Sequence, residues 1–221
     1  MTRPLSDALG LPASRGPRIL VAGAHADDAE IGAFGTIARL IEERPDGSVA
    51  WLVLAAPDPV RAAEARASAE RLLAGAASCV VDVRDLRDGY LPFLGAAPKE
   101  AIAEHAAFDP DLVLAPRRDD AHQDHRLVSE LMPQVFRRAT VLEYEIPKWD
   151  GDLGQANLYV PLSAGQVAAK VAHLAVSFPS QQGRDWFSAD TFQAVLRLRG
   201  VESHASEGTA EGFICRKLVV G

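Results

Sequence analysis

The sequence predicts an α/β fold in which helices cover both faces of a mostly parallel sheet. From Arg18 onward, apolar runs typical of buried strands alternate with helix-like patterns, and the alternation is strict as far as residue 145. Such alternation is typical of right-handed β–α–β crossovers. The expected strands are 19–24, 49–55, 79–83, 112–115, 140–145, 157–161 and 213–219, and the expected helices are 29–43, 60–74, 99–107, 124–138, 163–177 and 190–197.

The chain has the length and composition of one domain. Its 221 residues fall near the upper end of what a single core holds, and 48% of them are hydrophobic. Residues 18–221 are expected to form this domain. Residues 1–17 mix Pro, Gly, Ser and Arg without periodicity, which predicts a loose lead-in.

Charge and hydropathy argue against several classes of partner. The net charge is −7, the pI is near 5.4 and the basic residues are scattered, so no nucleic-acid surface is expected. No run reaches the roughly 18 apolar residues of a membrane span, and the first residues lack the apolar region of a signal peptide. We therefore expect a cytoplasmic protein without membrane insertion, for which a homo-oligomer is possible.

Cys79 and Cys215 stand in apolar surroundings and are expected to be buried, free thiols.

The first informative motif is AHADDAEIGAFG, residues 24–35, where the first strand ends and the first helix begins. Open α/β sheets bind ligands at the carboxyl ends of their strands. The GxGxxG fingerprint of dinucleotide binding is absent, and two carboxylates would repel a pyrophosphate. This argues against a nicotinamide-dependent oxidoreductase and favours a cation.

His25 and Asp28 are three residues apart across the strand-to-helix turn and can face one point. An imidazole and a carboxylate together suit zinc. The motif alone leaves an alternative open, in which Asp27 or Asp28 caps the following helix and His25 has no special role.

The second motif is RRDDAHQDHR, residues 117–126, directly after the expected strand 112–115. The first and fourth strands are neighbours in common doubly wound sheets, so the two motifs would share one crevice. His122 and His125, three apart on a helix, would lie on one face. A histidine pair at this spacing also occurs on solvated helix faces, but three of the chain's six histidines fall in these two motifs. Together the motifs favour a metal site.

These two motifs resemble the signatures of one enzyme family. The segment AHADDAEIGAFGTIARL (24–40) resembles the AHPDDxExGxGGTI signature of the PIG-L/LmbE-like de-N-acetylases, and HQDHR (122–126) resembles their HPDHR motif. Looser similarity extends to DLRDGYL (85–91) and PSQ (179–181). The resemblance implies a Rossmann-like fold and zinc-dependent removal of acetyl groups from GlcNAc-containing substrates.

The resemblance also implies a role for each site residue. His25, Asp28 and His125 take the positions of the metal ligands, with Zn²⁺ as the expected ion and Fe²⁺ or Co²⁺ as alternatives. Asp27 matches the general base. His122 matches the residue that supports the oxyanion or protonates the leaving amine, and Asp124 a carboxylate that orients a histidine.

Charged residues are candidates for binding sugar hydroxyls or a phosphate, although surface charge explains each of them equally well. These candidates are Arg117, Arg118, Asp119 and Asp120, which directly precede the histidines of the second motif, and Arg199, which belongs to the looser family similarity. The sequence thus predicts a metal-dependent hydrolase that removes an N-acetyl or other N-acyl group from an amino-sugar-like small molecule, such as an N-acetylated sugar or glycoconjugate. The alternatives are a hydrolase of a non-sugar amide or ester and a non-catalytic sugar- or nucleotide-binding module.

Overall fold

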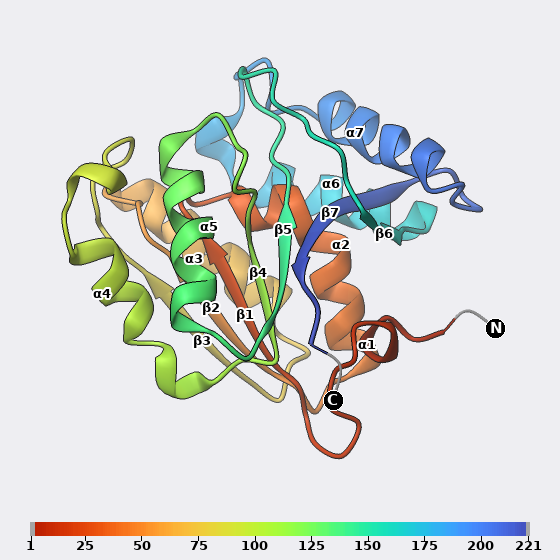
Figure 1. The fold of residues 1–221 in the computed structure, drawn as a ribbon. Coiled ribbons are helices and arrows are strands. Elements are labelled where there is room, and N and C mark those ends of the chain that lie inside the picture. The colour runs from red at the N-terminus through yellow and green to blue at the C-terminus, as the bar shows by residue number, and fades with distance from the viewer. Residues whose placement is uncertain (1–2, 220–221) are drawn as a thin grey trace.

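Seven strands form one sheet in the computed structural model, which describes residues 3–219 (Figure 1). Their order is β3-β2-β1-β4-β5-β7-β6. Strands β1 to β5 are parallel, and β7 runs antiparallel to both β5 and β6. The predicted α/β class with a mostly parallel sheet is confirmed, and β1 and β4 are neighbours as expected.

The elements follow one another as the alternation predicts. The strands are β1 Arg18–Gly23, β2 Ser48–Val53, β3 Ser78–Val83, β4 Leu112–Pro116, β5 Thr140–Tyr144, β6 Leu158–Pro161 and β7 Ala210–Lys217. The α-helices are α1 Leu5–Ala8, α2 Asp28–Glu43, α3 Pro59–Leu72, α4 Ala97–Ala103, α5 Gln123–Val135, α6 Ala164–Ser177 and α7 Ala189–Glu202. Single 3₁₀ turns lie at η1 Leu91–Phe93, η2 Ala106–Phe108 and η3 Pro179–Gln181.

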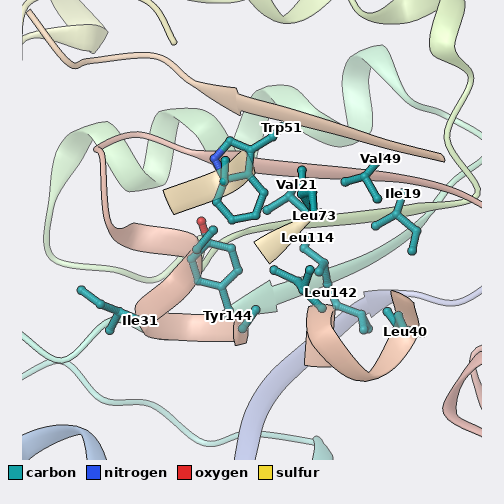
Figure 2. Close-up of a cluster of buried hydrophobic side chains, with 14 of the residues drawn as sticks. Ile19, Val21, Ile31, Leu40, Val49, Trp51, Leu73, Leu114, Leu142 and Tyr144 are labelled. Carbon is teal, nitrogen blue, oxygen red and sulfur yellow. The ribbon is translucent and has the colours of Figure 1, made fainter. Parts of the chain in front are cut away.

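Alternate side chains of the central strands enter two separate cores, one on each face of the sheet. On one face, Val21 and Trp51 pack with α2, α3, α6 and α7, and Figure 2 shows them beside Leu114, Leu142 and Tyr144. The opposite face is covered by α4 and α5. Its core contains Leu20, Ala22, Leu52, Val113, Ile102 and Met132. Because both faces are buried, the central strands are continuous apolar runs, as is typical of parallel sheets.

Local signals in the sequence fix where several helices begin. Asp58 caps α3 by accepting hydrogen bonds from the backbone N–H groups of Val60 and Arg61, and Pro59 occupies the first helical position. Ser163 and Gln166 form a capping box at the start of α6. These caps satisfy backbone donors that have no partner within the helix.

Two expectations from the sequence were wrong. The segment 1–17 is not a loose lead-in throughout, because Leu5, Leu9 and Leu11 are buried in the core and Glu43 accepts hydrogen bonds from the start of α1. The cysteines are free but not buried: Cys79 is exposed on the edge strand β3, and Cys215 is half-buried on β7. An apolar neighbourhood in sequence does not distinguish an edge strand from a central one.

Among the described residues, no helix is long and apolar enough to cross a membrane.

Gly32 sets how closely α2 approaches the sheet. A Cβ atom at this position would overlap the ring of the buried Tyr144 on β5. The Tyr144 hydroxyl donates a 2.7 Å hydrogen bond to the carbonyl oxygen of Ala22 at the end of β1. Gly32 therefore lets one tyrosine hold the helix, β5 and β1 together.

We expect Gly32→Ala to lower the free energy of unfolding by about 1–3 kcal/mol, because overpacking a filled core outweighs the roughly 1 kcal/mol that alanine gains over glycine in a helix. Urea unfolding followed by circular dichroism measures the change. The matched control is Gly165→Ala on α6, where a Cβ atom meets nothing closer than the Ser163 hydroxyl oxygen at 3.8 Å. Equal stability of the two variants would contradict this account.

Candidate active site

A cleft of about 680 Å³ opens at the carboxyl edge of the sheet, above the junction of β1 and β4. This is the switch point where the chain reverses direction across the sheet, and it is the usual ligand site of such folds. Both predicted motifs reach it. The lining residues are His25, Asp27, Asp28, Asp58, Val60, Arg61, Asp88, His122, His125, Ile146, Lys148, Trp149, Asp150, Ser180, Gln181, Arg184 and Trp186.

Two imidazole nitrogens and the Asp28 carboxylate, the predicted metal ligands, lie together at the floor of the cleft. His25 Nδ1 lies 3.0 Å from His125 Nε2, although the two residues are 100 positions apart. Asp28 carboxylate oxygens lie 3.6 Å from His25 Nδ1 and 3.3 Å from His125 Nε2. Ligands at about 2.0–2.1 Å from a tetrahedral ion are separated by about 3.3 Å, so this spacing suits a zinc-sized cation.

The remaining nitrogen of each histidine faces a carboxylate. His25 Nε2 lies 3.0 Å from Asp88 Oδ1 and 3.3 Å from Asp124 Oδ2. Asp124 is itself fixed, because it accepts hydrogen bonds from the backbone of the 89–91 turn. His125 Nδ1 lies 3.1 Å from Asp120 Oδ1. Carboxylates placed in this way orient imidazole ligands and raise their basicity.

Charge around the cleft floor stabilises an ionised carboxylate at Asp28. Burial would raise the pKa of Asp28, but His125 and His25 outweigh burial and hold it well below its usual value. Burial would also lower the pKa of His125, yet Asp28 and Asp120 raise it to about 8. These mutual shifts indicate that the local field at the cleft floor favours positive charge.

The residues present fit a divalent cation. His122 also lies close to this group: one ring nitrogen each of His25, His122 and His125 lie within 4.8 Å of one another and could hold a metal ion. Two imidazole nitrogens facing each other across 3.0 Å cannot both be neutral acceptors without repulsion. A cation between them removes this repulsion and uses the lone pairs of both.

Asp27 lies beside this group and does not act as a helix cap. It occupies the N-cap position of α2, but its side chain makes no capping hydrogen bond. Its Oδ2 atom is 3.0 Å from Arg61 Nη2 without the alignment of a hydrogen bond. Burial raises the pKa of Asp27 against the attraction of Arg61, and the neighbouring Asp28 adds to the increase. A buried carboxylate with raised proton affinity is suited to accepting a proton.

His122 is the N-cap of α5, and its Nδ1 atom accepts a 3.3 Å hydrogen bond from the backbone N–H of Asp124. Burial, followed by the nearby His25 and His125, lowers the pKa of His122. The lowered pKa favours the neutral ring, in which the accepting role of Nδ1 assigns the proton to Nε2. His122 thus offers one N–H donor in the cleft.

None of the five predicted substrate-binding residues lines the cleft. Arg117 is buried and bonds to backbone oxygens, Arg118 lies beside Glu143, and Asp119 is exposed. Arg199 is buried in a bidentate ion pair with Glu145. Asp120 reaches the site from behind, through His125. Sequence proximity to the motif did not reveal that these side chains point away from the cleft.

Several cleft residues were not singled out as candidates. Asp88 lies in the DLRDGYL stretch, which carried only loose family similarity. Arg61 follows the capping Asp58, but nothing in its own sequence context links it to Asp27. Trp149, Arg184 and Trp186 belong to loops without periodicity, where only an isolated aromatic or cation signals a binding surface.

Fold and site together define a Rossmann-like α/β protein with a candidate metal centre at its switch point. The chain belongs to the PIG-L family, described as GlcNAc-PI de-N-acetylase, whose profile matches residues 20–136. The match spans the sheet from β1 to the end of α5 and contains both motifs.

Solved structures with the same fold cover nearly the whole chain. An N,N′-diacetylchitobiose deacetylase from Pyrococcus horikoshii is 19% identical, with 95% of this chain and 88% of that chain covered and a TM-score of 0.67. A deacetylase of the teicoplanin biosynthetic pathway is 16% identical, with 89% and 96% covered and a TM-score of 0.68. The 4-carboxy-2-hydroxymuconate hydratase GalB from Pseudomonas putida is 19% identical, with 93% and 98% covered and a TM-score of 0.71.

We expect Asp120→Asn to weaken the affinity for Zn²⁺ by about 10- to 100-fold, because an amide cannot supply negative charge opposite His125 Nδ1. Competition with a chromogenic chelator measures this affinity. Asp119→Asn, one residue earlier and exposed, is the control and should leave it unchanged. Parent-like affinity in Asp120→Asn would show that the carboxylate does not support the site.

Proposed function

We propose that the protein is a zinc-dependent hydrolase that removes an N-acetyl or other N-acyl group from an amino-sugar-like substrate. The observation that supports this proposal is that His25 Nδ1, His125 Nε2 and the Asp28 carboxylate lie together in the cleft, with Asp27 buried beside them. Family membership and the deacetylase neighbours support the reaction type.

His25, Asp28 and His125 would hold the metal. Three protein ligands leave a tetrahedral ion one open position, which is typical of catalytic rather than structural zinc. The ion would supply Lewis acidity, lowering the pKa of water to about 7 and polarising the acyl carbonyl. Fe²⁺ or Co²⁺ would serve the same ligand set.

Asp27 takes the proton from the attacking water. Its raised pKa makes it a stronger base than an exposed carboxylate, and Arg61 keeps it ionised before the reaction. The water oxygen bonds to the acyl carbon, and the carbon–nitrogen bond then breaks to give a carboxylate and an amine.

His122 donates its Nε2 proton as a hydrogen bond to the oxygen that gains negative charge. Preorganised donors of this kind contribute a large part of the catalysis in acyl transfer. The departing amine needs one proton, which Asp27 can return or His122 can give, since both side chains line the cleft.

We expect His25→Ala and His125→Ala to purify without bound metal, because each removes one of three ligands. Asp27→Asn should keep the metal and lose about 10²- to 10⁴-fold in turnover, since only the base is lost. Elemental analysis and an assay for released acetate measure the two effects. Asp119→Asn serves again as the control, and parent-like turnover in Asp27→Asn would refute the role of Asp27.

Release of the amine from N-acetylglucosamine and its glycosides should exceed release from N-acetyl amino acids and from simple acetate esters. This panel separates a sugar deacetylase from a hydrolase of other amides or esters. Metal-loaded protein that releases neither acetate nor amine from any member would overturn the proposal and favour a binding module. Because GalB is a hydratase, consumption of 4-carboxy-2-hydroxymuconate is followed in parallel.

A further inference from the structure

The outer wall of the cleft is made by two loops beyond the sheet. One loop follows β5 and contributes Trp149, and the other joins η3 to α7 and contributes Arg184 and Trp186. Figure 1 shows both loops rising beside each other above the carboxyl edge of the sheet. None of these three residues enters the chemistry proposed above.

The two tryptophans form a corner at the mouth of the cleft. Their ring centroids are 6.1 Å apart and their planes meet at 76°. Trp186 is held from behind by Phe187, at 5.6 Å between centroids, whereas Trp149 is 68% exposed. An indole ring exposed at the mouth of a polar cleft offers a broad apolar face that is costly to leave in water. The corner therefore suits a ring-shaped ligand.

Arg184 places a positive charge at this corner, with its guanidinium carbon 5.7 Å from the Trp149 ring centroid. The other cations of the cleft are neutralised: Arg61 contacts Asp27 and Glu64, and Lys148 contacts Asp120 and Asp152. Between residues 3 and 219, no carboxylate forms an ion pair with Arg184. It is thus the cleft cation whose charge is available to a ligand.

We propose that Trp149, Trp186 and Arg184 form a subsite for the amine-bearing part of the substrate, in which a sugar ring packs against the indoles and an acidic substituent pairs with Arg184. The proposal rests on the proposed function for the position of the acyl group at the histidines. It deepens that function by assigning the substrate class: an N-acylated amino sugar that carries a carboxylate or a phosphate.

The charge distribution of the cleft gives this substrate one orientation. Of the five lining carboxylates, Asp27, Asp28 and Asp88 lie at the inner end and would repel an acidic substituent there, whereas Asp58 caps α3 and Asp150 follows Trp149. The outer end attracts it through Arg184, whose planar fork pairs with carboxylate and phosphate alike. An acidic substituent bound by Arg184 at the outer end therefore places the amide of the substrate at the histidines of the inner end.

The test measures binding of reaction products by calorimetry, because products bind without turnover. The probes are glucosamine, glucosamine 6-phosphate, muramic acid and inorganic phosphate. We expect at least one of the two acidic sugars to bind about tenfold more tightly than glucosamine, and Arg184→Gln to abolish that difference. Trp149→Ala should weaken all three sugars by about tenfold, because each loses the indole face.

Two controls match these variants. Arg137→Gln removes an exposed arginine at the opposite edge of the sheet, and Phe93→Ala removes an aromatic ring that is 75% exposed outside the cleft. Both should bind every probe as the parent does.

Equal affinity for neutral and acidic sugars, or no measurable binding of any sugar, overturns the proposal. It is also overturned if inorganic phosphate binds as tightly as the sugar phosphate and is insensitive to Trp149→Ala, since the corner would then bind only an ion. Because binding and acetate release are measured separately, a chain that binds acidic amino sugars but releases no acetate retains the subsite and refutes the proposed reaction.

Discussion

The parallel pairing of β1 with β4 is the constraint on which the site depends. These strands are distant in sequence, yet their hydrogen-bonded register places the ends of both at one edge, where their following turns meet. Each turn carries part of the candidate ligand set: one imidazole and one carboxylate after β1, and one imidazole at the start of α5. Only the pairing of the two buried strands brings these side chains to a single site.

The carboxylates at this edge of the sheet alternate with basic side chains that balance their charge. Asp28 is surrounded by two histidines, and those histidines are flanked by Asp88, Asp124 and Asp120 on their outer sides. Lys148 then neutralises Asp120. Such alternation orients the rings, and the two histidines beside Asp28 keep its carboxylate ionised although it is buried.

The sequence predicted the sheet class and the meeting of the two motifs because both depend on local patterns: apolar runs, and polar turns at strand ends. It did not identify the roles of Arg61 and Asp88, since their contacts with Asp27 and His25 arise only from tertiary packing. Arg199 was a misleading candidate for the same reason: its guanidinium is directed into a buried pair with Glu145. Residue type and spacing show what a turn can bind, but not which way a long side chain points.

The cleft is divided between rigid and replaceable parts. Its inner residues come from strand ends and helix starts that are anchored in two cores, whereas Trp149, Arg184 and Trp186 come from loops that pair with no strand. Loops of this kind accept substitutions and insertions that a buried strand does not. Substrate preference can therefore change during evolution through substitutions in the outer loops, while the inner residues of the cleft stay the same.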